Sequence, residues 1–210
     1  METEELNIFD EYRNLLGIET REDVHRKGHW HETFHCWIVS REEGADRIHL
    51  QLRSSNKKDF PGLFDITAAG HLLSKETPMD GVREVEEELG LAIAFEDLIP
   101  LGVIKDQIHQ EGFIDNEHCH NFLYLAKENS DLRFELQKEE VAGMVSADFQ
   151  AFSELCMGKR GQAAVEGFKM ADDGTAEPFA KTIRKTDLVP HSQSYLEQVA
   201  VRLKQVLEKA

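Results

Sequence analysis

The sequence predicts an α/β fold in which helices cover both faces of a mixed sheet. Three observations lead to this prediction. Segments rich in aromatic and β-branched residues recur between Thr33 and Ala126. A short helical segment after Gly70 interrupts them, and two more segments with helical spacing come from Ala147 onward. Strands, a helix, more strands and closing helices are the order expected for a sheet layered between helices.

The strands are predicted from alternating or continuous apolar runs. In chain order we expect them at Asn7–Tyr12, Thr33–Val39, Arg47–Arg53, Leu63–Ala69, Leu98–Ile108, Glu117–Ala126 and in a short segment after Val141. Residues Glu42–Asp46 are polar and contain Gly44, so the strands on either side should form a hairpin. Thr20 should cap a helical turn that ends at Lys27, because Asp23 stands three residues after it.

The chain is predicted to divide after residue 147. Residues 1–147 form the sheet domain, and residues 148–210 form a helical extension packed on it. The extension has helical spacing at Ala147–Cys156 and Gln193–Lys209. The polar stretch Lys169–Pro178 between them is predicted to be a loop. The last helix carries an apolar stripe that would pack on the chain itself or on a second copy, so a homodimer is one expectation.

Composition excludes several kinds of protein. The 210 residues are 40% hydrophobic and 30% charged, which is enough apolar material for a core. No run reaches the roughly 18 apolar residues of a membrane span, and the acidic N-terminal residues lack signal-peptide features, so we expect a cytoplasmic location. The net charge of −16 argues against general nucleic-acid binding. The cysteines have no CxxC spacing and are expected to be buried free thiols.

The helix after Gly70 carries the candidate functional residues. Thr77 is its predicted N-cap, Pro78 its first residue and Gly90 its stop. The helical period gives it an apolar face, formed by Val82, Val85 and Leu89. The same period gathers three carboxylates on another face, those of Glu84, Glu87 and Glu88. Such carboxylates repel one another, and Mg²⁺, which prefers oxygen ligands, would relieve the repulsion. The alternative interpretation is a solvated acidic face.

The stretch Gly70–Leu91 resembles the Nudix box. In that motif a glycine and a glutamate precede the pattern R-E-apolar-x-E-E-x-G-apolar at fixed spacing. Gly70 and Glu76 match the first part, and Arg83–Leu91 matches the whole second part. Six residues separate Glu76 from Arg83, one fewer than in the usual box. The loop path should therefore differ, while the metal-binding part is intact.

This resemblance implies an α/β/α sandwich and an enzyme that hydrolyses a diphosphate linkage in a nucleoside diphosphate compound or a related organic diphosphate. It implies that Mg²⁺ or Mn²⁺ is held by the carboxylates of Glu84, Glu87 and Glu88 and by the carbonyl of Gly70. Glu76 and Arg83 would orient these ligands. The general base would be a box glutamate or Glu140. For Glu140, an ordinary exposed loop residue is an equally good interpretation.

Similarity continues over about Ile8–Val145 toward Nudix proteins related to isopentenyl-diphosphate isomerase. The segments that carry it are HRKGHWHETFHCWIV, LQLRSSNKKDFPGLFDITAAGH and DNEHCHNFLYLA. Within them Arg53 is the best candidate for a phosphate contact. Lys57 and Lys58 would help as mobile groups, although solvent exposure is the favoured interpretation of both.

Isomerase activity itself is disfavoured by two positions. Those isomerases place a catalytic cysteine before a Gly-His pair, and here Ala69 precedes Gly70 and His71. They also bind a metal through histidines and a Glu-x-Glu pair. His31 and His71 match two such histidines and Glu117 one carboxylate, but Cys119 would replace the second carboxylate. The histidines alone are also typical of packing residues.

The sequence therefore predicts a hydrolase. The second hypothesis is a Nudix domain that binds a nucleotide without cleaving it. Such proteins often lose the acidic set, which is complete here.

Overall fold

The computed structural model describes residues 4–42, 44–127 and 132–210. Its strands are β1 (Glu5–Phe9), β2 (Leu15–Thr20), β3 (Trp30–Glu42), β4 (Ala45–Arg53), β5 (Phe64–Asp65), β6 (Ala68–His71), β7 (Leu98–Gln110), β8 (Phe113–Leu125), β9 (Val141–Asp148), β10 (Ala163–Met170) and β11 (Ala176–Ile183). Its α-helices are α1 (Arg21–Lys27), α2 (Arg83–Leu89), α3 (Phe149–Cys156) and α4 (Gln193–Leu207).

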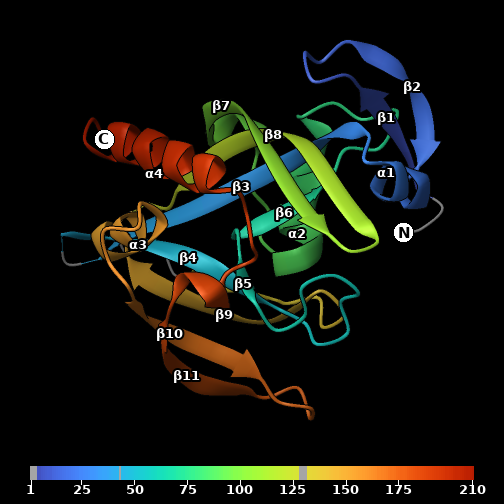
Figure 1. The fold of residues 1–210 in the computed structure, drawn as a ribbon. Coiled ribbons are helices and arrows are strands. Elements are labelled where there is room, and N and C mark those ends of the chain that lie inside the picture. The colour runs from blue at the N-terminus through green and yellow to red at the C-terminus, as the bar shows by residue number, and fades with distance from the viewer. Residues whose placement is uncertain (1–3, 43, 128–131) are drawn as a thin grey trace.

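The described strands form one mixed sheet around β3 (Figure 1). β3 is parallel to β8, with Trp30–Val39 opposite Asn116–Leu125. Its other edge pairs antiparallel with β6 near the start of the strand and with β4 near its end. The sheet continues from β4 through β9 and β10 to β11, and β1 and β2 extend it beyond β3. The predicted mixed sheet is confirmed.

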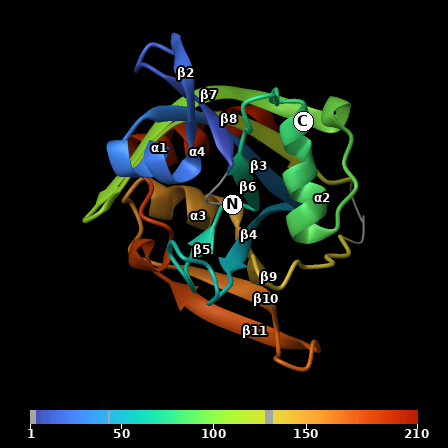
Figure 2. The ribbon, with the colours of Figure 1, turned by 90° about the vertical axis from the view of Figure 1, so that its right-hand side faces the viewer.

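Alternate side chains of β3 enter two separate apolar clusters. Trp37 and Val39 pack in the cluster that contains the buried faces of α3 and α4. Cys36 and Ile38 pack in the cluster that contains Val85 of α2. Successive side chains of a strand point to opposite faces, so helices cover both sides of the sheet, as predicted. Figure 2 shows α2 on one side, apart from α3 and α4.

Side chains decide two local features of the N-terminal half. Thr20 caps α1 as predicted, because its hydroxyl accepts from the backbone N–H of Asp23 at 3.3 Å. The predicted strand Leu63–Ala69 is instead divided into β5 and β6. Between them the hydroxyl of Thr67 accepts from the backbone N–H of Ile38 at 2.9 Å, so a side chain replaces the backbone ladder there. The predicted hairpin between β3 and β4 is present, although residue 43 of its turn lies outside the described residues.

The start of α2 differs from the prediction. A 3₁₀ turn at Asp80–Val82 precedes the α-helix, which begins at Arg83. Thr77 does not cap it by accepting a bond. Its backbone N–H and hydroxyl donate to the Asp80 carboxylate, at 2.8 and 2.7 Å. The predicted stop is confirmed, since Gly90 follows the helix with φ of 69°.

The C-terminal third corrects the prediction of a purely helical extension. Its two predicted helices are present, but β10 and β11 form a hairpin between them that joins the sheet at β9. The stretch Lys169–Pro178, predicted to be a loop, is the turn of this hairpin with the ends of both strands. The apolar stripe of α4 packs on the chain's own core, one of the two arrangements expected for it, and a homodimer stays a prediction. Among the described residues, no helix is long and apolar enough to cross a membrane.

Candidate active site

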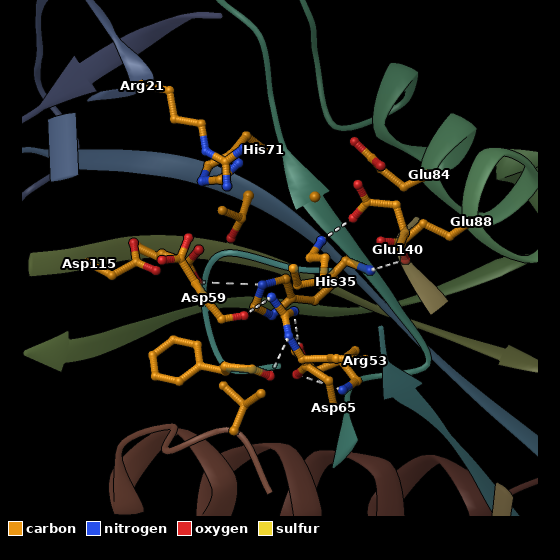
Figure 3. Close-up of a pocket in the computed structure, with 18 of the residues that line it drawn as sticks. Arg21, His35, Arg53, Asp59, Asp65, His71, Glu84, Glu88, Asp115 and Glu140 are labelled. Carbon is orange, nitrogen blue, oxygen red and sulfur yellow. Dashed lines mark hydrogen bonds and ion pairs between the residues drawn. The ribbon is translucent and has the colours of Figure 1, made fainter. Parts of the chain in front are cut away.

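A cavity of about 720 Å³ lies between the sheet, α1, α2 and the loop after β4 (Figure 3). It collects nearly all the residues that the sequence predicted to be functional. Lining it are Arg53, Lys57, Gly70, His71, Glu76, Arg83, Glu84, Glu87, Glu88, Glu117 and Glu140. Figure 3 shows Glu84, Glu88 and Glu140 on one side and Asp115 on the other. The cavity therefore has two chemically distinct sides.

Gly70 allows α2 to approach β6 on the first side. A Cβ atom built at position 70 would lie 2.2 Å from the carboxyl carbon of Glu84. Real Cβ contacts are never that close, so any side chain at position 70 would push Glu84 away. The glycine of the motif is thus required by the position of the Glu84 carboxylate.

The guanidinium of Arg83 fixes the glutamates around it. Its Nε and Nη2 donate to the two carboxylate oxygens of Glu76, at 2.7 and 3.0 Å, in the planar fork that arginine favours. Its Nη1 donates to Glu84 at 2.6 Å and to Glu87 at 3.2 Å. The hydrogen bond from Arg83 holds the pKa of Glu76 below its usual value. This arrangement supports the predicted orienting role of both residues.

We call Glu84, Glu87 and Glu88 the acidic cluster. Burial raises the pKa of Glu84 to about 7 and that of Glu88 to about 8. The Glu88 carboxylate accepts from Gln51 Nε2 at 3.1 Å and from the backbone N–H of Ala69 at 3.3 Å. The buried carboxylates of Glu84 and Glu88 fit a divalent cation, and an all-oxygen donor set fits Mg²⁺ or Mn²⁺.

Glu140 and Lys57 form an ion pair at the edge of the acidic cluster. Both side chains are mostly covered, with exposed fractions of 24% and 21%. Glu140 precedes β9 and lines the same cavity as Glu88. It is therefore not a freely solvated loop residue, and its role as a base stays a prediction.

Arg53, whose role as a phosphate contact stays a prediction, lines the cavity with its donors bound to internal partners. Its Nη1 donates to Asp65 Oδ2 at 2.8 Å, its Nη2 to the carbonyl of Asp59 at 2.8 Å and its Nε to the carbonyl of Phe60 at 3.2 Å. The side chain lines the cavity but is directed to these internal partners. Arg53 thus stabilises the conformation of the loop that carries Lys57.

The second side of the cavity holds a cluster that the sequence predicted only in part. We call it the histidine cluster, and its members are His25, His31, His71, Asp115 and Glu117. Within the groups His25–His31–His71 and His31–Asp115–Glu117, the potential ligand atoms all lie within 4.8 Å of one another. The cluster draws on α1, β3, β6 and β8, which span residues 21 to 125 of the chain.

The hydrogen bonds of this cluster leave several buried polar atoms without a partner. The Nδ1 atoms of His25 and His31 lie 2.9 and 3.2 Å from the carbonyls of Arg21 and His29, so each N–H belongs on Nδ1. The Nε2 atoms of His31 and His71 and Oδ1 of Asp115 are buried without a hydrogen-bond partner. Burial lowers the pKa of both His31 and His71, which keeps them neutral. Neutral imidazoles with carboxylates fit a transition metal such as Mn²⁺.

This geometry corrects the prediction that one carboxylate of the pair is lost. Cys119, the neighbour predicted for Glu117, donates its Sγ–H to Glu117 Oε2 at 3.4 Å. The second carboxylate beside Glu117 comes from Asp115, two residues before it on β8. Asp115 lies 3.4 Å from His31 Nε2 and from His25 Nε2. Alternation on a strand could have revealed it, since Asp115 and Glu117 must share a face.

Two more residues escaped the sequence analysis. His25 and Arg21 both line the cavity from α1. The helix is only seven residues long, and nothing in its own pattern distinguishes these side chains from surface residues. Figure 3 shows Arg21 reaching toward His71.

Ala69 occupies the position before Gly70 at which the isomerases carry their catalytic cysteine, so no thiol is present there. Its methyl group lines the cavity beside Gly70. Cys36, Cys119 and Cys156 are all buried free thiols, as predicted, and none of them lines the cavity.

The chain is similar to several known proteins. The NUDIX domain family model matches residues 29–168. An uncharacterised Nudix hydrolase of Clostridium acetobutylicum is 39% identical over 199 residues, which cover 95% of this chain and 96% of the relative. An isopentenyl-diphosphate Delta-isomerase of Saccharopolyspora erythraea is 25% identical over 152 residues, which cover 71% and 75%. A solved structure from Deinococcus radiodurans has a TM-score of 0.51 and 17% identity, and it covers 70% of this chain and 85% of its own, a likeness of fold alone.

Proposed function

The chain belongs to the Nudix hydrolases, enzymes that act on diphosphate bonds, and we propose that it is a Mg²⁺- or Mn²⁺-dependent pyrophosphohydrolase of a small organic diphosphate. The substrate would be a nucleoside diphosphate linked to a second group, or a related compound. The observation that carries the proposal is the convergence of Gly70, the acidic cluster and Arg83 on one wall of the cavity.

The acidic cluster and the Gly70 carbonyl would hold the metal. A bound divalent cation would neutralise the phosphate charge and lower the pKa of a water molecule. Arg83 would keep Glu84 and Glu87 in place for this role. Deprotonation of Glu84 and Glu88, whose pKa values burial raises, would accompany metal binding.

The remaining groups would bind the substrate. Lys57 and Arg21 line the cavity and would attract the diphosphate, which the net charge of −16 otherwise repels. Glu140 would act as general base only if substrate drew Lys57 away from it. A box glutamate is the other candidate for the base. The histidine cluster would hold a further metal ion across the cavity.

The test uses purified protein with Mg²⁺ or Mn²⁺ and a panel of nucleoside diphosphate compounds and isopentenyl diphosphate. Released phosphate is measured after coupling to a phosphatase, alongside Glu87→Gln. Metal-dependent turnover that disappears in this variant supports the proposal. If no compound is cleaved while nucleotides raise the melting temperature, the chain is a nucleotide-binding domain and the proposal is wrong.

The completeness of the histidine cluster favours one alternative, the isomerisation of isopentenyl diphosphate. Against it stands Ala69, whose methyl group cannot transfer a proton. Detection of dimethylallyl diphosphate in the same panel decides between the two activities.

A further inference from the structure

His191 links the C-terminal third of the chain to the cavity wall. It lies between β11 and α4 and lines the cavity. Its Nδ1 is 2.7 Å from Asp106 Oδ2 on β7, and its Nε2 is 3.0 Å from Asp65 Oδ1 on β5. An ionised carboxylate only accepts hydrogen bonds, so both ring nitrogens donate and the ring is an imidazolium.

This cation is held between two buried anions. The exposed fractions of His191, Asp65 and Asp106 are 9%, 6% and 1%. Burial disfavours the charge, but hydrogen bonds to Asp106 and Asp65 raise the pKa of His191 to about 10. The backbone N–H of Ser192 also donates to Asp106, at 2.8 Å, which fixes the entry to α4. Removing the cation would leave two buried carboxylates short of a partner.

Asp65 connects His191 to the loop that follows β4. Its other oxygen accepts from Arg53, whose remaining donors bind the carbonyls of Asp59 and Phe60. Phe60 has φ of 53°, a conformation that residues other than glycine rarely adopt, so the loop needs such support. Lys57 and Phe60 both line the cavity. His191, in the segment before α4, is therefore connected to the cavity-lining loop through two ion pairs, His191–Asp65 and Asp65–Arg53.

We infer that His191 is a positioning residue that holds loop 57–60 in its cavity-lining conformation through Asp65 and Arg53. Its kinetic consequence rests on the proposed function, in which Lys57 on this loop attracts the substrate diphosphate. Loss of His191 should therefore weaken substrate binding more than the chemical step.

The experiment compares His191→Gln with His49→Gln. His49 is a matched control because it is also a buried histidine, hydrogen-bonded to Ser40 at 2.8 Å, and it does not line the cavity. In His191→Gln, amide hydrogen exchange at residues 57–60 and 62 should rise about tenfold, while the amides of β3 keep their protection. KM should rise about fivefold or more with kcat within about twofold of the parent value. The control should change neither quantity.

Unchanged exchange of the loop in folded His191→Gln would overturn the inference. If that variant does not fold, Arg53→Lys tests the same route, since lysine keeps the charge but loses the fork that binds both carbonyls. Unchanged loop exchange in Arg53→Lys likewise overturns it. The exchange measurement needs no substrate, so it decides the matter even if no compound is hydrolysed and the proposed function fails.

Discussion

The space around Gly70 leaves no room for a side chain. Alanine at this position would bring a Cβ within 2.2 Å of the Glu84 carboxyl carbon. We predict that Gly70→Ala lowers kcat/KM for the diphosphate substrate about 100-fold, because Glu84 leaves its position at the metal. The variant should still fold, since Glu84 can rotate toward the cavity. Steady-state kinetics with saturating Mg²⁺ measure the effect.

Gly161→Ala is the matched control for this substitution. A Cβ at position 161 would meet nothing within 4 Å, and the residue lies outside the cavity lining. It should leave kcat/KM and the melting temperature unchanged. Comparable activity of Gly70→Ala and the parent would contradict the assigned position of Glu84.

The charge of His191 predicts a pH dependence of stability. Its pKa of about 10 in the folded chain lies above the ordinary 6.5, so the folded state binds this proton more tightly than the unfolded state. The resulting stabilisation is fully present below pH 6.5 and is lost as pH rises through about 10. Between these limits, the stability difference between the parent and His191→Gln should shrink by on the order of 2–4 kcal/mol.

Urea unfolding of both chains at pH values from 6 to 10 measures this difference directly. Taking the difference removes the contribution of other titrating groups that the two chains share. A difference that stays constant over this range would show that folding does not raise the pKa of His191.

At the scale of elements, prediction succeeded where local signals were strong. The glycine stop of α2, the cap of α1 and the apolar runs of β3 and β8 all stand in contiguous residues. The hairpin of β10 and β11 was missed because its strands are rich in alanine, lysine and glutamate and bury few side chains. β11 is an edge strand, and its Pro178 and charged residues are typical of edges that avoid pairing with other chains.

Gly143 on β9 and Gly167 on β10 let this hairpin approach β9 closely. A Cβ at Gly167 would lie 2.1 Å from the carbonyl oxygen of Met144, across the β9–β10 ladder. We predict that Gly167→Ala lowers the free energy of unfolding by about 1–3 kcal/mol, because the two strands must separate. Denaturant unfolding measures the loss. Glu166→Ala, on the same strand with a side chain that is 73% exposed, should cost about 0.5 kcal/mol or less. Equal effects of the two substitutions would contradict close packing at Gly167.

At the scale of the whole molecule, the histidine cluster shows what sequence patterns leave out. Its ligands come from four elements, and they come together only after β3 has paired with both β6 and β8. Resemblance found His31, His71 and Glu117, but the wrong neighbour was paired with Glu117, and His25 was not considered. The acidic cluster was predictable because a helix brings it together within five residues of chain.

The two clusters face one cavity, and this arrangement predicts two separable metal sites. Metal-stripped protein titrated with Mn²⁺ in a calorimeter should bind about two ions, because each cluster supplies its own ligands. Glu84→Gln should abolish one binding event and His71→Asn the other, each leaving its counterpart measurable. At a metal concentration of about 100 times the dissociation constant, each site should add about 2.7 kcal/mol to the free energy of unfolding. If His71→Asn leaves both binding events intact, the unpaired buried atoms of His31, His71 and Asp115 have another explanation, and only the acidic cluster binds metal.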